Sequence, residues 1–252
     1  MGRAYGAVPS RPDPRDHKVH RYMAVAPETM PASFQSTPLV PIYDQDGYGM
    51  CVAFTLAEVK EAEEAVDKGS QTRFSPAFIY GNRGIFDAKG EGMSPRDALK
   101  QLRKGGVCPW SMYSILGDYR TCHKGITKAM RRAATPHVIQ AFARATTPDE
   151  LKSAIYHTGP CMLCIPVYDS FESVGNSGVV PMVKSGERLL GYHATMVYGW
   201  TADGYWNVQN SWGKTWGNGG RCLIPLDYFT LSTSASEDQR MEGWTIVDRL
   251  AE

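Results

Sequence analysis

The sequence predicts an α+β fold in which a helical half, about residues 41–130, precedes a half of antiparallel strands, about residues 131–252. The first half contains runs of helix-forming composition with recognisable ends, whereas after residue 160 short apolar runs alternate with turns that contain glycine. At 252 residues the chain is long enough to bury a large core, either as one domain or as two subdomains around a cleft.

Local signals mark the expected elements. In the helix predicted over residues 94–105, Ser94 is the N-cap, Pro95 takes the first helical position and Gly105 stands at the end. Further helices are expected over 50–69, over 75–84 and from about Thr147. Strands are expected at 161–167, 179–183, 193–200, 204–210 and 220–226.

Cys51 is the candidate nucleophile. It lies in the run QDGYGMCVAF (45–54), after a turn with two glycines and at the start of the predicted helix 50–69. At a helix N-terminus the helix dipole and unpaired backbone N–H groups favour the thiolate, which is the reactive form of cysteine. A thiol still needs a basic imidazole within hydrogen-bond reach to become a standing nucleophile.

His193 is the candidate for that imidazole, and Asn210 for the group that orients it. The two residues are 17 positions apart, which suits neighbouring strands joined by a loop at TADG (201–204). An amide that bonds one imidazole nitrogen fixes the tautomer and turns the other nitrogen to sulfur. The side-chain amide of Gln45 and the backbone N–H of Cys51 would then form an oxyanion hole.

With Gln45 six residues before Cys51, an AF pair after it, His193 before a small residue, and NSWG at 210–213, the chain resembles the papain-like cysteine peptidases. The resemblance spans about Pro41 to Phe229 and implies a helical subdomain with the nucleophile, packed on a β-sheet or barrel subdomain. The block GEGMSPRDALKQLRKGGVCP (90–109) is similar to the bacterial and viral branch of the family.

The resemblance also implies that the Trp212 indole covers the Asn210–His193 contact and excludes water from it. Gly90 and Gly92 are candidates for backbone hydrogen bonds to an extended substrate, because glycine allows close approach. The chain departs from the family at two positions. Tyr48 stands where many relatives have a disulfide-bonded cysteine, and Val52 stands where tryptophan usually follows the nucleophile.

The other cysteines and histidines have no comparable surroundings and are interpreted as core or surface residues. The C-x-x-C pair Cys161 and Cys164 lies in a predicted strand, where residues three apart point to opposite faces, so neither a metal site nor a redox pair is expected. Cys108 and Cys122 could still form a bridge. We expect no cofactor and no metal, and a reducing compartment, either cytoplasmic or virion-associated.

The charge balance of 27 basic against 26 acidic residues, a net charge of +1, gives no argument for nucleic acid or an anionic membrane as a partner. No apolar run approaches the roughly 20 residues of a membrane span, and the N-terminus lacks the apolar region of a secretory signal. The expected partner is a protein or peptide substrate.

Residues 1–40 are expected to form a separate, extended segment, because prolines such as Pro9, Pro12, Pro14 and Pro31 exclude a long helical pro-domain. Two hypotheses remain for this segment. It packs along the enzyme and restricts access to Cys51, or it only anchors the chain to its own sheet or to a larger assembly.

The sequence therefore predicts a thiol endopeptidase. Two other classes stay open: an acyltransferase that passes the thioester to an amine, and a weakly active relative that serves as a structural component of an assembly.

Overall fold

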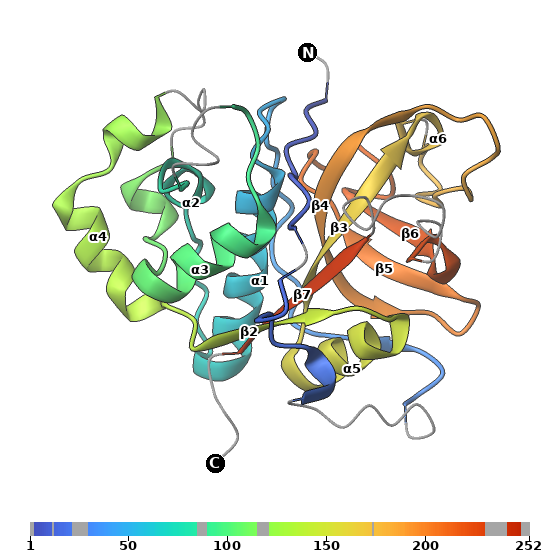
Figure 1. The fold of residues 1–252 in the computed structure, drawn as a ribbon, viewed down its shortest axis with the longest axis horizontal. Helices are drawn as coiled ribbons and strands as arrows, with labels where there is room; N and C mark the ends of the chain where they lie inside the picture. Colours follow the sequence, from blue (N-terminus) through green and yellow to red (C-terminus); the bar gives the residue numbers. More distant parts are fainter. Residues whose placement is uncertain are drawn as a thin grey trace.

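The computed structural model describes residues 3–11, 13–21, 30–84, 90–114, 121–172, 174–229 and 241–247. Figure 1 shows a group of helices on one side and a twisted sheet on the other, with the N-terminal residues running along the junction. The predicted α+β class is confirmed. Helices and strands lie in two separate parts, as the change of pattern along the sequence indicated.

The sheet half consists of antiparallel strands. They are β1 (Phe34–Gln35), β2 (Ala141–Ala145), β3 (Cys161–Tyr168), β4 (Leu189–Trp200), β5 (Tyr205–Gln209), β6 (Arg221–Pro225) and β7 (Glu242–Val247). The strand order is β2-β7-β3-β4-β5-β6, and β1 pairs with β4. Since β2 and β6 end this order without pairing with each other, the described sheet is open, and the barrel allowed as an alternative is not formed.

The prediction of a strand at 179–183 is wrong. Residues 179–180 make only an isolated bridge to Leu223 of β6, and the chain then continues without strand geometry. Pro181 explains the difference, since proline has no N–H to donate to a ladder and interrupts a strand in the middle of a sheet.

The helical half confirms the predicted ends. Ser94 caps its helix by accepting a hydrogen bond from the Asp97 N–H, and Gly69 ends the first helix with φ of 62°. The α-helices on this side are α1 (Cys51–Lys68), α2 (Pro76–Gly81), α3 (Pro95–Gly105) and α4 (Lys128–Ala134), of which α4 was not predicted. Short 3-10 helices are η1 (Val19–Arg21), η3 (Trp110–Met112), η4 (Cys122–Gly125) and η5 (Thr135–His137).

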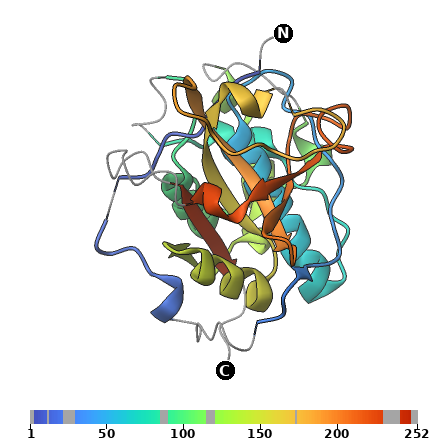
Figure 2. The same ribbon diagram turned by 90° about the vertical axis from the view of Figure 1, so that its right-hand side faces the viewer.

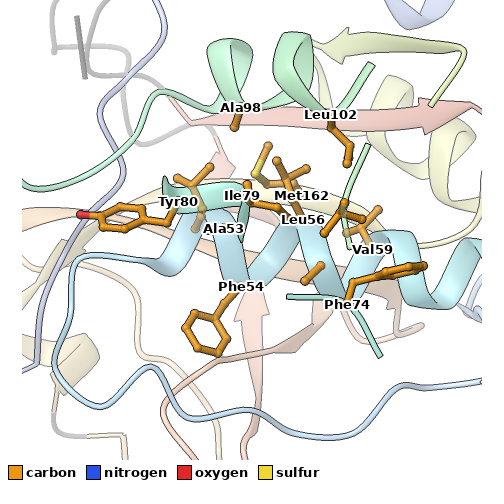
Figure 3. Packing of buried hydrophobic residues seen from close by; sticks show 14 of the residues in the cluster. Ala53, Phe54, Leu56, Val59, Phe74, Ile79, Tyr80, Ala98, Leu102 and Met162 are labelled. Carbon is orange, nitrogen blue, oxygen red and sulfur yellow. The ribbon is translucent and has the colours of Figure 1, made fainter. Parts of the chain in front are cut away.

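Helix α1 lies between the other helices and the sheet. All its residues from 51 to 64 are buried, so it is covered on every side. In Figure 3, Leu56 of α1, Ile79 of α2, Leu102 of α3 and Met162 of β3 belong to one apolar cluster. Burial on all sides fixes the axial position of α1, and thereby the position of its first residue, Cys51.

A second apolar cluster lies on the other face of the sheet. Helix α5 (Pro148–Thr158), capped by Thr147 as predicted, packs there against β7 (Figure 2), and the one-turn helix α6 (Asp169–Glu172) follows β3. Cys161 belongs to this cluster and Cys164 to the cluster around α1, so the two thiols point to opposite faces as predicted. In the parts of the chain described, no helix is long and apolar enough to cross a membrane.

All six cysteines are outside disulfide bonds, so the possible Cys108–Cys122 bridge is not formed. We therefore expect a reducing agent to leave the melting temperature nearly unchanged while it protects Cys51 from oxidation. Thermal unfolding followed with and without reductant measures this. A fall of more than roughly 8 °C would reveal a structural disulfide, because losing one removes about 2–4 kcal/mol from a chain of this length.

Candidate active site

Cys51 is the first residue of α1, as the sequence predicted, and its side chain is fully buried. A tight turn leads into it, with positive φ at Asp46 and Gly47 and a hydrogen bond from the Met50 N–H to the Tyr48 carbonyl. The preceding residue, Met50, makes no side-chain cap. The helix N-terminus is therefore open toward the sulfur, where its dipole favours negative charge.

His193 and Asn210 come from adjacent strands of the sheet. His193 lies in β4, and Asn210 directly follows β5, which pairs with β4. His193 Nε2 lies 2.7 Å from Asn210 Oδ1, and both residues are fully buried. Asn210 Oδ1 also accepts a hydrogen bond of 2.8 Å from the Ser211 N–H, which fixes the orientation of the amide. Because Oδ1 can only accept, Nε2 carries the proton and Nδ1 is left as the basic nitrogen.

Trp212 covers this pair. Its ring centroid lies 4.5 Å from that of His193, at an interplanar angle of 31°, and the indole is largely buried. This is the position that the resemblance implied. Apolar cover keeps water away from the Asn210–His193 hydrogen bond and so strengthens it.

The Cys51 sulfur lies near β4, where the backbone N–H of Ala194, the residue after His193, favours the charged form of the thiol. His193 Nδ1 has no hydrogen-bond partner among the described residues. The structure thus brings Cys51 and the His193–Asn210 pair to the same place from the two halves of the fold. The hydrogen bond between Cys51 and His193 that the sequence predicted is not formed in this structure.

Burial keeps both groups neutral in this structure. Desolvation raises the pKa of the Cys51 thiol, and the opposing backbone N–H groups of Ala194, Gly6 and Val52 only reduce that effect. For His193, desolvation lowers the pKa to about 4, although the hydrogen bond to Asn210 acts in the other direction. A thiolate–imidazolium pair is therefore disfavoured until water reaches the site.

Gln45 precedes the turn that leads into α1 and is almost completely buried. Its Nε2 donates to the carbonyl oxygens of Tyr48, at 2.7 Å, and of Ala4, at 3.1 Å. Its Oε1 accepts a hydrogen bond of 2.8 Å from Ser211 Oγ. One amide N–H is thus committed within the site, and the other is directed at a carbonyl oxygen of the N-terminal segment.

The N-terminal residues 3–11, here called the strap, run through the site. Backbone hydrogen bonds hold the strap to both halves: Met93 N–H to Gly6 O (2.8 Å), Val8 N–H to Met93 O (3.0 Å) and Ala7 N–H to Tyr192 O (3.1 Å). Figure 1 shows this part of the chain between the helices and the sheet. The strap therefore lies over Cys51 and closes the cleft between the two halves.

Side chains of the strap cover the imidazole. The ring of Tyr5 lies edge-on to His193, with centroids 6.4 Å apart, and to Trp212, with centroids 6.0 Å apart. The Arg3 guanidinium lies 4.9 Å from the Trp212 ring and donates to the carbonyl oxygen of Glu172. These contacts account for the complete burial of His193.

At Gly6 the backbone of the strap is in close contact with the backbone of the helical half. A Cβ atom added to Gly6 would lie 2.0 Å from the carbonyl oxygen of Gly49. A Cβ atom on Gly92, which also belongs to the helical half, would lie 2.7 Å from the carbonyl oxygen of Gly6. Because the opposing atoms belong to the backbone, they cannot rotate away, and the strap can lie here only with glycine at position 6.

The predicted roles of Gly90 and Gly92 are only partly reflected in the structure. Gly92 supplies close approach, but Met93 makes the backbone hydrogen bonds to the extended segment. Gly90 has open space around its Cα, and its carbonyl accepts a hydrogen bond from Arg83. The contact made by Met93 was missed, because no side-chain chemistry marks a residue that acts through its backbone.

Ser211 was also missed. It bonds both Gln45 and Asn210, and it stands between Asn210 and Trp212 in the NSWG run, so its place in the motif was the available signal. No group of three or more His, Cys, Asp or Glu side chains that could hold a metal ion is present in the described part of the chain.

The profile of the papain family cysteine proteases matches residues 26–234, most of the chain. The chain belongs to this family. The match supports a hydrolase of the cysteine peptidase class, in agreement with the chemistry of the residues that meet in the cleft.

Two similar proteins match nearly the whole papain-like chain. Xylellain, a cysteine protease from Xylella fastidiosa, superposes with a TM-score of 0.81 at 26% identity, covering 99% of this chain and 98% of its own. An uncharacterised peptidase C1-like protein of Acanthamoeba polyphaga mimivirus is 26% identical over 94% of this chain and 86% of its own length. These similarities support the bacterial and viral branch.

Other similar proteins match over less of this chain. This chain spans 61% of a gut-specific cysteine proteinase of Caenorhabditis elegans, at 28% identity over 71% of this chain. The bromelain protease of Ananas comosus, in complex with the inhibitor E64, superposes with a TM-score of 0.65 at 20% identity, covering 87% of this chain and 100% of its own, which shows a shared fold.

Proposed function

We propose that this chain is an endopeptidase that hydrolyses peptide bonds through a thioester on Cys51. The observation that carries the proposal is the His193–Asn210 hydrogen bond of 2.7 Å, which leaves His193 Nδ1 as a base beside the thiol at the start of α1. This is the arrangement that nucleophilic thiol catalysis needs: a nucleophile, a base and a group that orients the base.

In the proposed reaction, His193 Nδ1 takes the thiol proton and the Cys51 sulfur attacks the substrate carbonyl carbon. Gln45 Nε2 and the Cys51 N–H stabilise the oxyanion that forms. The carbon–nitrogen bond then breaks as His193 returns the proton to the leaving amine, which gives the thioester. Water attacks the thioester with His193 again as the base, and the acid product and the thiol are released.

Product analysis tests this function. The protein is incubated with a mixture of unmodified peptides, with and without an added amine, and the new ends are identified by mass spectrometry. Free carboxyl ends in both mixtures support hydrolysis. Amides formed from the added amine as the main products would instead indicate acyl transfer, and a chain that turns over no peptide after its cleft is opened would indicate a structural role.

We also propose that the strap keeps the enzyme latent, so that residues 3–11 act as a tethered plug. Two effects support this. The strap occupies the space above Cys51 that a substrate needs, with its Ala4 carbonyl oxygen on Gln45 Nε2. It also excludes water, and so favours the neutral thiol and imidazole over the ion pair.

The strap is attached next to the cleft by Arg96 of α3. The Arg96 side chain is nearly buried, binds both carboxylate oxygens of Asp16 and donates to the Arg11 carbonyl, while its backbone N–H donates to Ser10 Oγ. Beyond this clamp, Val19 is fully buried. Residues 10, 11 and 13–21 can thus stay in place while residues 3–9 of the strap leave the cleft, which makes opening reversible.

Replacing Gly6 with alanine is expected to open the cleft. The added Cβ meets the Gly49 backbone, so the strap loses three backbone hydrogen bonds and its contact with Gln45. At about 1 kcal/mol for each bond, we expect Cys51 to react with iodoacetamide roughly a hundred times faster than in the unchanged chain. The labelling rate, with the site mapped by mass spectrometry, measures the effect.

Gly105→Ala is the matched control, because a Cβ atom there meets nothing within 4 Å. Removal of residues 1–11, which keeps the buried Val19 and the Asp16 clamp, should reproduce the effect of Gly6→Ala. An unchanged labelling rate in both opened chains, with the fold intact by thermal unfolding, would refute the plug and leave only the anchoring role.

A further inference from the structure

We infer that Ser211 is a positioning residue of the oxyanion hole: its hydroxyl holds the Gln45 amide so that Nε2, and not Oε1, faces the reacting carbonyl. The inference rests on the proposed function, and it adds a residue to which that mechanism gave no role. Ser211 is almost fully buried in the short turn that follows β5.

Two hydrogen bonds join Ser211 to Gln45. The Gln45 backbone N–H donates to the Ser211 carbonyl at 2.9 Å, and Ser211 Oγ donates to Gln45 Oε1 at 2.8 Å. The backbone bond fixes where the glutamine starts, and the hydroxyl bond fixes which end of its amide points away from the cleft. The glutamine is therefore held at both ends by one residue of the opposite half of the fold.

The contacts of Gln45 Nε2 show which group is the donor in the hydrogen bond between Ser211 Oγ and Gln45 Oε1. Gln45 Nε2 faces two carbonyl oxygens, those of Tyr48 and Ala4, which can only accept hydrogen bonds. The nitrogen must therefore lie on that side and the oxygen on the side of Ser211, whose hydroxyl has to donate. A flipped amide would place oxygen against oxygen at Tyr48.

The Ala4 carbonyl oxygen stands in for a substrate oxygen. It belongs to the strap and takes the one N–H of the Gln45 amide that Tyr48 does not bind. Once the strap leaves, this N–H is the donor available to an oxyanion, while Tyr48 continues to hold the other. The Ser211 bond is unaffected by that exchange, so it keeps the donor directed in the open enzyme as well.

Without the hydroxyl, Oε1 becomes a buried acceptor with no donor. The amide can then regain a partner only by rotating, which turns Nε2 away from the oxyanion or presents oxygen lone pairs to it. Either rotation reduces the stabilisation of the transition state. It hardly changes substrate binding in the ground state, because the ground-state carbonyl carries little negative charge. The loss should appear in kcat and not in KM.

A side-chain substitution separates this effect from the imidazole. Ser211 reaches Asn210 only through its backbone N–H, which bonds Asn210 Oδ1 at 2.8 Å and remains when the side chain is changed. Ser211→Ala should therefore leave the His193–Asn210 pair, and the reactivity of the thiol, as they were.

The test is a double-mutant cycle of Ser211→Ala and Gln45→Ala in the full chain, with Gly6→Ala present in every member to open the cleft. Peptide turnover and alkylation of Cys51 by iodoacetamide are measured for each member. We expect Ser211→Ala to lower kcat roughly 3- to 10-fold, as the loss of one hydrogen bond does, with KM and the alkylation rate unchanged. In the Gln45→Ala background it should have no further effect on kcat.

Equal losses from Ser211→Ala in both backgrounds, or a loss shared by alkylation, would overturn the inference and indicate a structural role. Unchanged kcat in Ser211→Ala would overturn it as well. If the alanine variant does not fold, Ser211→Cys keeps the volume with a weak donor and should show the same pattern. Failure of the proposed function looks different, because the parent chain itself then releases no peptide product.

Discussion

Replacing Cys51 with alanine is expected to reduce peptide turnover to background, a fall of roughly 10⁴–10⁶ in kcat. No other group in the site can form the thioester, because His193 and Asn210 are placed to activate and orient and not to attack. Turnover is measured in the opened Gly6→Ala chain, since the strap covers the thiol in the unchanged one.

Labelling with an epoxide or vinyl-sulfone peptide probe gives the complementary result. All six cysteines are buried, so the unchanged chain should label slowly at every position. In the opened chain only Cys51 gains access to water and to a base. Burial raises the pKa of Cys108 to about 11 and that of Cys161 to about 12, so those thiols remain protonated.

Cys108→Ala is the matched control and should keep both turnover and labelling. Preferential labelling at another cysteine, with Cys51 unmodified in the opened chain, would remove Cys51 as the nucleophile. Mapping by mass spectrometry distinguishes the six positions directly.

Replacing Gln45 with alanine is expected to lower kcat by roughly 10²–10³, or about 3–4 kcal/mol, with the thiol still reactive. The variant removes the amide donor that the structure directs at the Ala4 carbonyl oxygen, and it leaves the Cys51 N–H as the remaining donor. In the opened Gly6→Ala chain, alkylation of Cys51 should continue at the parent rate, because alkylation forms no oxyanion.

Asn210→Ala should lower turnover less than Gln45→Ala, because it removes orientation and no donor to the reacting atoms. It should also slow alkylation, since the His193 tautomer is no longer fixed by the 2.7 Å hydrogen bond.

Gln140→Ala is the matched control for Gln45→Ala, because it removes a glutamine side chain at an exposed position. Parent-like kcat in Gln45→Ala would exclude its amide from the oxyanion hole.

The positions of the helices could be predicted because residues close to their ends in the sequence start and stop them. Ser94 and Pro95 start α3, Thr147 starts α5 and Gly69 ends α1, and each acts on backbone groups within a few residues. Strands β2 and β7 were missed, since each is short and gains its hydrogen bonds from partners about 80 to 100 residues away.

The sequence by itself determined which residues could carry the chemistry. Cys51 follows a tight turn at a helix start, and Gln45 directly precedes that turn. His193 lies in β4 and Asn210 directly follows β5, the strand that pairs with β4 after a short loop. Such relations depend on short stretches of backbone, and short stretches are what sequence patterns encode.

Only the tertiary structure decided the state of the site. That Gly6 passes between Gly49 and Gly92, that Tyr5 covers His193, and that Ser211 holds Gln45 are contacts between parts of the chain that no local pattern connects. The perturbed pKa values of Cys51 and His193 follow from the same burial. Burial is a property of the closed surface, and it arises only when both halves and the strap meet.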